Sequence, residues 1–466
     1  MINFQHPQYK ANIKKWELIE NVCEGKNLKE YIVKINKHDA SESAVQRRAQ
    51  FFNRSVFYAI AGYTSQGFLG KAFSEPAKCS VPENMDFVRY DIDGAGTSIY
   101  QQCQEVFKEV VRVGRGGLLV DFPHVEGEVS RQDQLNGKVS ATVTNYTANQ
   151  IVNWQVEKIG AKLKPTLIVL KSVDHVRHDD GFGFDEVDIF IELRLEEGFY
   201  IQREWRHDPL TDKWYMVSES QPRDASGNKF NFIPFVFVGS EANTSRVDFA
   251  PMYDIARINI GHYNNSAIYE DSVFTVGQVQ PWMSGLSQDV IDDLNKSGIF
   301  IGSGRLMGVP SGEKFDFAQA QPNSLAREAM MDKVQMMIGL GAMFLTPTGV
   351  AKTATQVDGE LMAQHSVLSL ISANVSEAYN EALGIVKMFM GASYDEEAYL
   401  KINQEFIKPE ATAQEITAVV GAFLQGALPM ADLLDWQQKH GLVNKEKTLE
   451  EYSEDIGMQE TIELED

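Results

Sequence analysis

The spacing of apolar side chains divides the chain into a helical part, a β-rich part and a second helical part. From 16 to 73 the apolar residues fall three or four positions apart, which predicts two or three helices, one of them starting after Ser41. Another helix is predicted over 97–113. Between 151 and 238, five short runs of β-branched and aromatic residues are separated by charges or by Gly, Pro and Asp. We expect these runs to form one antiparallel sheet.

The second helical part begins with two helices on either side of a small insert. The first helix is expected from 254 to about 269, and the second from 325 to 340. Asn323 and Ser324 offer N-cap oxygens to the second helix. The residues between the helices contain short β-like runs, which predicts a small α/β insert whose two ends lie beside each other.

A loop and an unusually long helix follow. Pro347 and Gly349 do not both fit inside a helix, so a loop is predicted over 342–355. Thr355 and Asp358 resemble a capping box, and apolar residues then recur every three or four positions to about Met390. A single helix over this distance would span on the order of 50 Å. Two long helices joined by a short loop indicate a device that positions the loop.

The C-terminal part is predicted to be helical and to end in an acidic tail. A short strand is expected over 399–403, a capping box at Thr412 and Glu415, helices through Trp436, and one more helix from Thr448. The tail after Lys447 contains no Lys or Arg, and we expect its end to be mobile.

Composition limits the function classes. The 466 residues suggest about three domains of ordinary size, and 43% hydrophobic content is enough for a substantial core. With 43 Lys and Arg against 65 Asp and Glu, the net charge of −22 disfavours a general affinity for phosphate backbones or anionic membranes. The sequence shows neither a long apolar span nor a signal-peptide core, so cytosol-like surroundings are expected.

Three groups of candidate residues have simpler structural interpretations. Arg47, Arg48 and Arg54 are more typical of a solvated helix face than of a phosphate patch. The glycines of 114–117 connect a helix to a strand, whereas a phosphate loop connects a strand to a helix, so a glycine turn is favoured; 302–308 fails the same comparison. The cysteines, which are Cys23, Cys79 and Cys103, lack zinc spacing and are expected to be buried free thiols.

The richest collection of metal-capable side chains lies between His175 and Asp188. If Gly181 were the sixth residue of a calcium loop, the first and twelfth positions would be Val176 and Val187, which cannot ligate a cation. We therefore expect a hairpin tip. Since nucleophile-elbow, Walker, zinc and kinase motifs are also missing, we assign no catalytic, metal or cofactor residue and expect a protein that is not an enzyme.

Four motifs, taken in order over about three hundred residues, resemble the portal proteins of tailed bacteriophages. They are residues 111–121, 146–154, 233–236 and 254–267. The motifs look like a portal-like family long labelled only as a domain of unknown function. Portal proteins form the ring at the capsid vertex through which DNA is packaged and ejected.

The resemblance implies an α+β portal fold. Its parts would be a wing (1–250), two stem helices (251–270 and 322–341), a clip (271–321), a tunnel loop (342–355), a long helix with a wing strand (356–411), and a short helical crown with an acidic tail (412–466).

The resemblance also implies partners and site residues. We expect a homo-dodecameric ring in the virion, double-stranded DNA in its channel, and contacts with the terminase large subunit, the major capsid protein, scaffold and a head–tail adaptor. The acidic composition fits a conduit that must not grip a moving duplex. The channel candidates are Thr346, Thr348, Lys352 and Thr353. The docking candidates in the clip are Phe274, Gln278, Trp282, Phe300 and Arg305.

Two other functions remain open from the sequence. One is a minor capsid or scaffold-like structural protein, which electron microscopy would separate from a ring with an axial hole. The other is a nucleic-acid enzyme with an unrecognised site, which nuclease and nucleotide-hydrolysis assays would detect.

Overall fold

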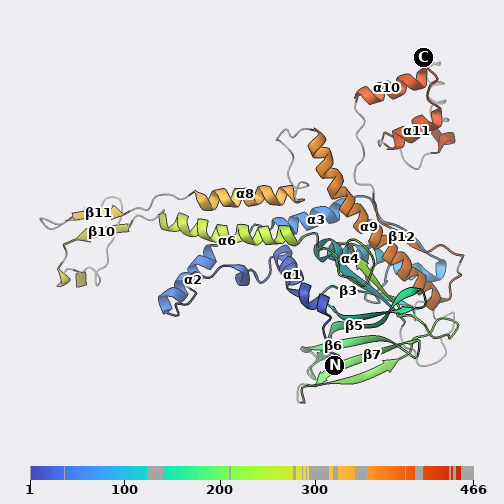
Figure 1. The fold of residues 1–466 in the computed structure, drawn as a ribbon, viewed down its shortest axis with the longest axis horizontal. Coiled ribbons are helices and arrows are strands. Elements are labelled where there is room, and N and C mark those ends of the chain that lie inside the picture. The colour runs from blue at the N-terminus through green and yellow to red at the C-terminus, as the bar shows by residue number, and fades with distance from the viewer. Residues whose placement is uncertain are drawn as a thin grey trace.

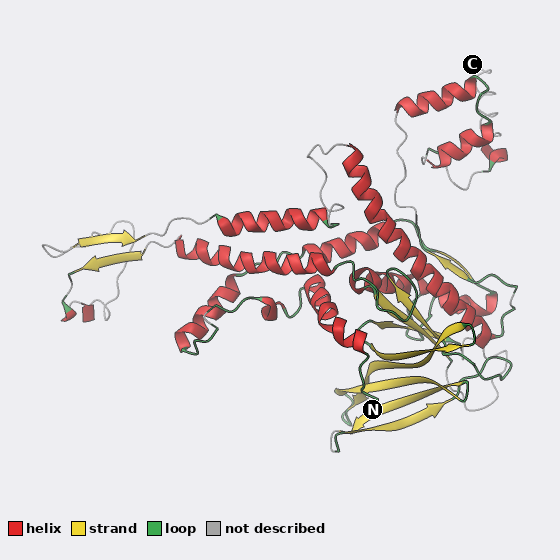
Figure 2. Cartoon of the chain, in the orientation of Figure 1, coloured by secondary structure: helices red, strands yellow, loops and turns green. Residues whose placement is uncertain are grey.

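The computed structural model describes the chain in segments: residues 2–35, 37–122, 140–208, 211–276, 280–285, 287–289, 291–292, 314–318, 324–341, 354–393, 395–404, 413–439, 442–443 and 448–452. Only the backbone is described at 275, 280–283, 314–318, 354–366 and 413–415. Figures 1 and 2 show helices and antiparallel strands in one chain, which confirms the expected α+β class.

The N-terminal part contains the expected helices. Its helical elements are α1 (Pro7–Glu24), η1 (Leu28–Tyr31), α2 (Glu42–Arg54), α3 (Ile60–Ala72), η2 (Glu83–Arg89) and α4 (Ile99–Val113). The Ser41 hydroxyl accepts a hydrogen bond from the Ala44 amide and caps α2. Ser98 and Gln101 form a capping box at the start of α4. Local side-chain chemistry therefore fixes where these two helices begin.

The β-rich part forms two sheets, so the expectation of a single sheet was wrong. The larger sheet has the order β4 (Ile151–Ile159), β5 (Lys162–Arg177), β6 (Phe184–Glu196), β7 (Phe199–Asp208) and β8 (Lys213–Ser220), all antiparallel. The last β-rich run becomes β9 (Phe235–Gly239), which pairs with β2 (Arg115–Asp121). With β3 (Thr142–Thr147) on the other side, these strands form a separate sheet. Pairing between strands far apart in sequence decided this outcome.

The glycines after α4 form a turn, as expected. Gly114 ends the helix with φ +75°, a conformation that favours glycine, and a Cβ there would collide with the Phe249 carbonyl. A Cβ on Gly117 would collide with the Phe235 ring. The strand β2 can therefore approach β9 closely because this position lacks a side chain.

The main core lies where α4 and the long helix α9 (Ala354–Met390) pack against the three-stranded sheet. The buried Tyr379 hydroxyl donates to Gln102 Oε1 at 3.1 Å, and Gln102 Nε2 donates to the Val143 carbonyl at 2.7 Å. This chain of hydrogen bonds joins α9, α4 and β3, because buried polar groups need partners. Cys23 and Cys103 are buried free thiols as expected, whereas Cys79 is only half-buried.

The second helical part has the predicted order. α6 (Tyr253–Val276) leads to a two-stranded sheet of β10 (Gln280–Ser284) and β11 (Lys314–Ala318), α8 (Leu325–Gly339) returns to the body, and α9 follows in the chain. Figure 1 shows α6 and α8 side by side, projecting away from the sheets. The expected short strand is β12 (Tyr399–Lys401), which pairs with β1 (Lys78–Ser80).

Two helices, α10 (Ala413–Leu424) and α11 (Met430–Lys439), follow near the C-terminus and lie apart from the other elements in Figure 1. Thr448 and Glu451 form a capping box, with bonds of 3.0 and 3.3 Å, where a further helix was expected to begin. Thr412 and the acidic tail after residue 452 lie outside the described residues. Within the described ranges, the search for a helix long and apolar enough to cross a membrane found none.

Candidate functional site

The helical hairpin of α6 and α8 is the candidate functional element, and we call it the stem. Its two helices run in opposite directions, and β10 and β11 form its tip (Figure 1). Met337 is buried where α8 meets the body, and Lys333 of α8 packs over Gly261 of α6. The stem therefore projects from the body with its far end covered by few other elements.

The helix α6 is longer than the sequence indicated. It continues past 269 to Val276, so Asp271 and Phe274, which we had placed in the clip, lie on the stem helix. Phe274 is 46% exposed, and the Arg54 guanidinium lies 3.6 Å from the centre of its ring. One face of the Phe274 ring therefore packs against Arg54 of the same chain. Less of the ring is available to a partner, which weakens the assignment of Phe274 as a docking residue.

Two arginines of α2 bind the same carboxylate on α6. Arg47 donates from both terminal nitrogens to Asp271, at 2.8 and 2.5 Å, and Arg54 donates to the same carboxylate at 2.8 Å. Hydrogen bonds from Arg47 and the charges of both arginines lower the pKa of Asp271. For Arg47 and Arg54 the expectation of a solvated helix face was wrong, because both bind this carboxylate. Sequence alone could not show that their partner lies more than two hundred residues away.

Residues 26–57, which we call the arm, pack along α6. Ile32 and Phe51 of the arm form a small core with Tyr263 and Ala267, separate from the main core. Polar side chains of α6 hold the arm's backbone at several points. Asn264 contacts the Tyr31 carbonyl and the Val33 amide, and Ser266 contacts both backbone groups of Val56. The arm is therefore attached to the stem along much of its length.

The exposed side of α8 carries acidic, basic and apolar side chains. Arg327, Glu328 and Asp332 are exposed there, and the Ser324 hydroxyl donates to Glu328 at 2.6 Å. Ser324 is the N-cap, but its side chain makes no capping bond to the backbone, so that expected interaction is absent at this residue. Met331, Met336 and Leu340 are 58%, 55% and 49% exposed. Met336 and Leu340 are four residues apart and lie on one stripe of the helix, and exposed apolar side chains that lie together are typical of a surface that binds another protein.

Most sequence-predicted site residues lie outside the described part of the chain. These are Gln278, Phe300 and Arg305 of the clip and Thr346, Thr348, Lys352 and Thr353 of the loop. Asn323, the other N-cap candidate, lies there too. Trp282 lies in β10, opposite Asp316 of β11, and only its backbone is described. The structure therefore brings none of these candidates together, and their roles remain predictions.

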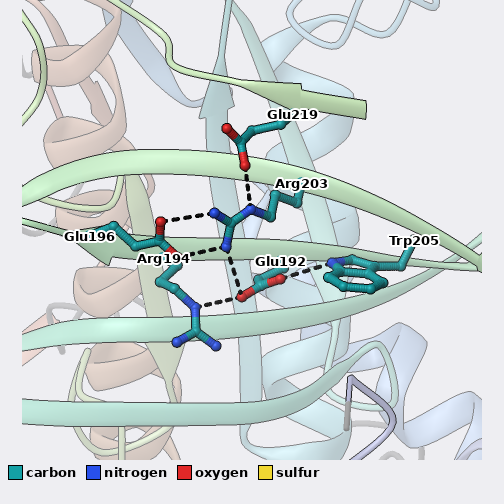
Figure 3. Close-up of polar contacts among 6 residues, drawn as sticks. All are labelled: Glu192, Arg194, Glu196, Arg203, Trp205 and Glu219. Carbon is teal, nitrogen blue, oxygen red and sulfur yellow. Dashed lines mark hydrogen bonds and ion pairs between the residues drawn. The ribbon is translucent and has the colours of Figure 1, made fainter. Parts of the chain in front are cut away.

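A network of charges crosses three strands of the larger sheet (Figure 3). Its members are Glu192, Arg194 and Glu196 of β6, Arg203 and Trp205 of β7, and Glu219 of β8. Arg203 binds Glu196 at 2.6 and 2.8 Å and Glu219 at 2.6 Å. Glu192 is only 3% exposed and accepts from Arg194 and from the Trp205 indole. Because all three nitrogens of Arg203 donate to carboxylates, the network joins strands and does not present Arg203 to a phosphate.

The histidine-rich segment between β5 and β6 is a hairpin tip, as expected. His178 and Gly183 share a backbone hydrogen bond of 2.9 Å, and Gly181 has φ +73°. His178 lies 3.0 Å from Asp185, and His175 lies 3.7 Å from Glu186. Within the described residues, three or more metal-capable side chains do not come together anywhere.

A polar cavity of about 410 Å³ lies between α1, α4 and β3. Glu109 lines it and accepts from the Ala148 amide at 2.9 Å. Burial, reinforced by the nearby charge of Glu20, raises the pKa of Glu109 to about 8. Arg112, almost fully buried beside the cavity, donates to Glu24 and Ser65. Sequence patterns gave no sign of this site, because its carboxylates come from separate helices.

Comparison with known proteins gives three findings. A family model described as "Domain of unknown function (DUF4055)" matches residues 251–390, which include the stem and α9. No curated protein matches the chain. Among solved structures, an HK97 family phage portal protein from Corynebacterium diphtheriae aligns with 82% of this chain and 97% of its own chain, at 10% identity and a TM-score of 0.30. Similarity of this size does not by itself establish a shared fold.

Proposed function

We propose that this chain is the portal protein of a tailed bacteriophage, a structural protein without catalytic activity. Copies of it would form a dodecameric ring at one capsid vertex, and double-stranded DNA would pass through the ring during packaging and ejection. In this proposal the stem lines or supports the channel, and the sheets and N-terminal helices form the wing around it.

The observation that carries the proposal is the stem itself. A helical hairpin leaves the body, ends in a small two-stranded tip, and is followed in the chain by a helix of 37 residues. This is the element order that the sequence motifs associate with portal proteins. The apolar residues on the outer face of α8 support assembly, because burying a side chain such as Met336 would contribute roughly 1.5–3 kcal/mol.

Charge supports a conduit for DNA over a DNA-binding protein. The chain carries a net charge of −22. Each phosphate neutralised by a protein releases counterions and strengthens the grip on the duplex. An acidic wall avoids this effect, so DNA can move past it.

The other assignments belong to the same proposal. The clip, 271–321, would bind the terminase large subunit during packaging and a head–tail adaptor afterwards, because short strands offer edges to a partner. The wing would contact the major capsid protein and scaffold. The loop 342–355, with Lys352 as its single charged residue, would lie at the narrowest part of the channel.

The decisive experiment is electron microscopy and mass measurement of the purified protein. We expect closed rings with an axial hole, and we expect Met336→Glu to prevent their formation without unfolding the subunit. Met388→Glu is the matched control, because Met388 is 50% exposed on the helix α9. A wild-type protein that stays monomeric at micromolar concentration would refute the proposal. A minor capsid or scaffold-like role would then be favoured, and nuclease and nucleotide-hydrolysis assays would test for an enzyme.

A further inference from the structure

A cavity of about 200 Å³, which we call the stem-base pocket, lies where the stem meets the body (Figure 1). It is lined by α3, α4, α6 and α9, by the end of α8 and by the segment that leads into α6. Its floor is apolar and buried, and includes Val111 of α4, Ile255 of α6 and Ile371 of α9. Water inside such a cavity finds few polar partners, so an apolar group is the occupant that fits it best.

Several apolar side chains that line the stem-base pocket are exposed to solvent. Phe249 is 57% exposed, Leu340 is 49% exposed and Val367 is 46% exposed, and the three come from separate segments of the chain. Among the described lining residues, Asp254 is the one that carries a charge. It lies in the first turn of α6, where the helix dipole favours a carboxylate. The pocket therefore offers exposed apolar surface to an apolar occupant.

The chain itself supplies apolar side chains next to this pocket. The segment 342–353, outside the described residues, joins Gly341, at the end of α8, to Ala354, the first residue of α9. Its three largest apolar side chains, Met343, Phe344 and Leu345, come near its beginning. A chain extends by at most about 3.6 Å per residue, so Phe344 lies within roughly 11 Å of Gly341. This distance allows Phe344 to reach a pocket that is lined by the residue before Gly341.

We infer that the side chain of Phe344 docks into the stem-base pocket of its own chain. An apolar cavity of roughly 150 Å³ accommodates a benzene ring, so about 200 Å³ is enough for a phenylalanine ring. Docking would cover the exposed side chains of Leu340 and Val367. The segment would then be attached to the body near its beginning, and Lys352, near its end, would take no part in this contact.

The same segment of a second copy is the other occupant to consider. The chain's own segment is favoured because three residues connect Phe344 to Gly341, and a short tether gives an effective concentration in the millimolar range. A second copy would lose translational and rotational freedom on binding. The inference goes beyond the proposed ring, since it concerns a contact within one chain.

The first test places a charge at the pocket in the full-length chain. Val367→Asp should release Phe344, and Leu370→Asp is the matched control, because Leu370 is 44% exposed on the same helix but does not line the pocket. Chymotrypsin cleaves after Phe344 only when the segment is undocked, and the cleavage rate then follows the undocked fraction. We expect cleavage about tenfold faster than wild type for Val367→Asp and unchanged for Leu370→Asp. Circular dichroism and thermal unfolding establish that both variants fold.

The second test traps the contact while Phe344 is kept. A disulfide requires Cα atoms within about 7 Å of each other, so Met343→Cys with Val367→Cys should form one within a single chain. Met343→Cys with Leu370→Cys is the control and should form a disulfide about tenfold more slowly. Met343→Cys alone accounts for the three native cysteines. Non-reducing gels separate a bond within one chain from a bond between two chains.

The outcomes separate this inference from the proposed function. Equal cleavage after Phe344 in wild type, Val367→Asp and Leu370→Asp would overturn the inference, as would a disulfide that forms no faster than its control. A disulfide that joins two chains would overturn it in favour of a second copy as the source of the segment. A chain that forms no rings but shows the expected cleavage and trapping would refute the portal proposal and support this inference.

Discussion

Replacing Asp271 with asparagine should loosen the arm from the stem. The substitution keeps the shape of the side chain but removes the charge that binds Arg47 and Arg54. The carboxylate is mostly buried, whereas the Arg47 side chain is 40% exposed, so solvent screens part of the interaction. Charge-assisted hydrogen bonds contribute roughly 1.5–3 kcal/mol when shielded, and exposed ion pairs contribute less than about 1 kcal/mol. We therefore expect a loss of about 1–2 kcal/mol.

Hydrogen exchange is the appropriate assay, since the loss concerns one segment and not the whole fold. A loss of this size corresponds to an increase of roughly 5- to 30-fold in the opening equilibrium of α2. The amides of α4, in the main core, serve as an internal reference and should be unaffected. Glu270→Gln makes the same chemical change one residue earlier and should leave α2 protected, because in the described part of the chain no arginine binds Glu270.

The pH dependence gives an independent check. Because the folded pKa of Asp271 is lowered, its contribution is fully present above the ordinary value of 3.8 and is lost as the pH falls below it toward the folded value. Wild-type α2 should therefore lose protection in this acidic range, whereas the asparagine variant should show no such change. Equal exchange of α2 in both proteins at neutral pH and low salt would refute the reasoning.

Three further predictions concern other parts of the chain. Since the pKa of Glu109 is raised to about 8, stability should fall as pH rises from about 4.5 to 8, and Glu109→Gln should remove this fall and stabilise the protein at pH 8 by roughly 1 kcal/mol or more, measured by thermal unfolding. Lys352→Ala should spare ring assembly but alter DNA retention in filled heads, more weakly at high salt, and Lys352→Glu should do so more strongly; equal DNA content in all three would assign the lysine no role. Deleting 280–318 should leave the wing folded but stop packaging, and normal filling of heads would contradict the clip assignment.

Local patterns predicted the elements of this fold well. The helix over 325–340, the long helix to Met390 and the turn at Gly114 all followed from apolar spacing and glycine placement. These features depend on residues close together in sequence. Helical periodicity and positive φ act over one or a few turns, so the sequence contains the information directly.

Contacts between distant segments could not be predicted in the same way. The run around Phe235 looks like its β-rich neighbours, but it pairs with β2, more than a hundred residues earlier. The sequence around Asp271 does not predict that two arginines bind it, and the sequence around Glu109 does not predict that it lines a cavity. In each case the deciding partner is brought close only by the complete fold. The loop and clip candidates beyond Phe274 and Trp282 lie outside the described residues, so those assignments stay predictions.

The C-terminal part of the helix α9 is anchored in the main core. Its residues from Leu368 to Met390 include eleven buried positions of the main core, and the Tyr379 hydroxyl donates to Gln102 inside that core. A helix is stiff over this length, so the direction of its buried part determines where Ala354, its first residue, is held. Packing of the buried part of α9 in the main core therefore sets the position at which this helix begins, tens of ångströms away. A substitution in this core that tilts α9 would move that entry point without altering any residue near it.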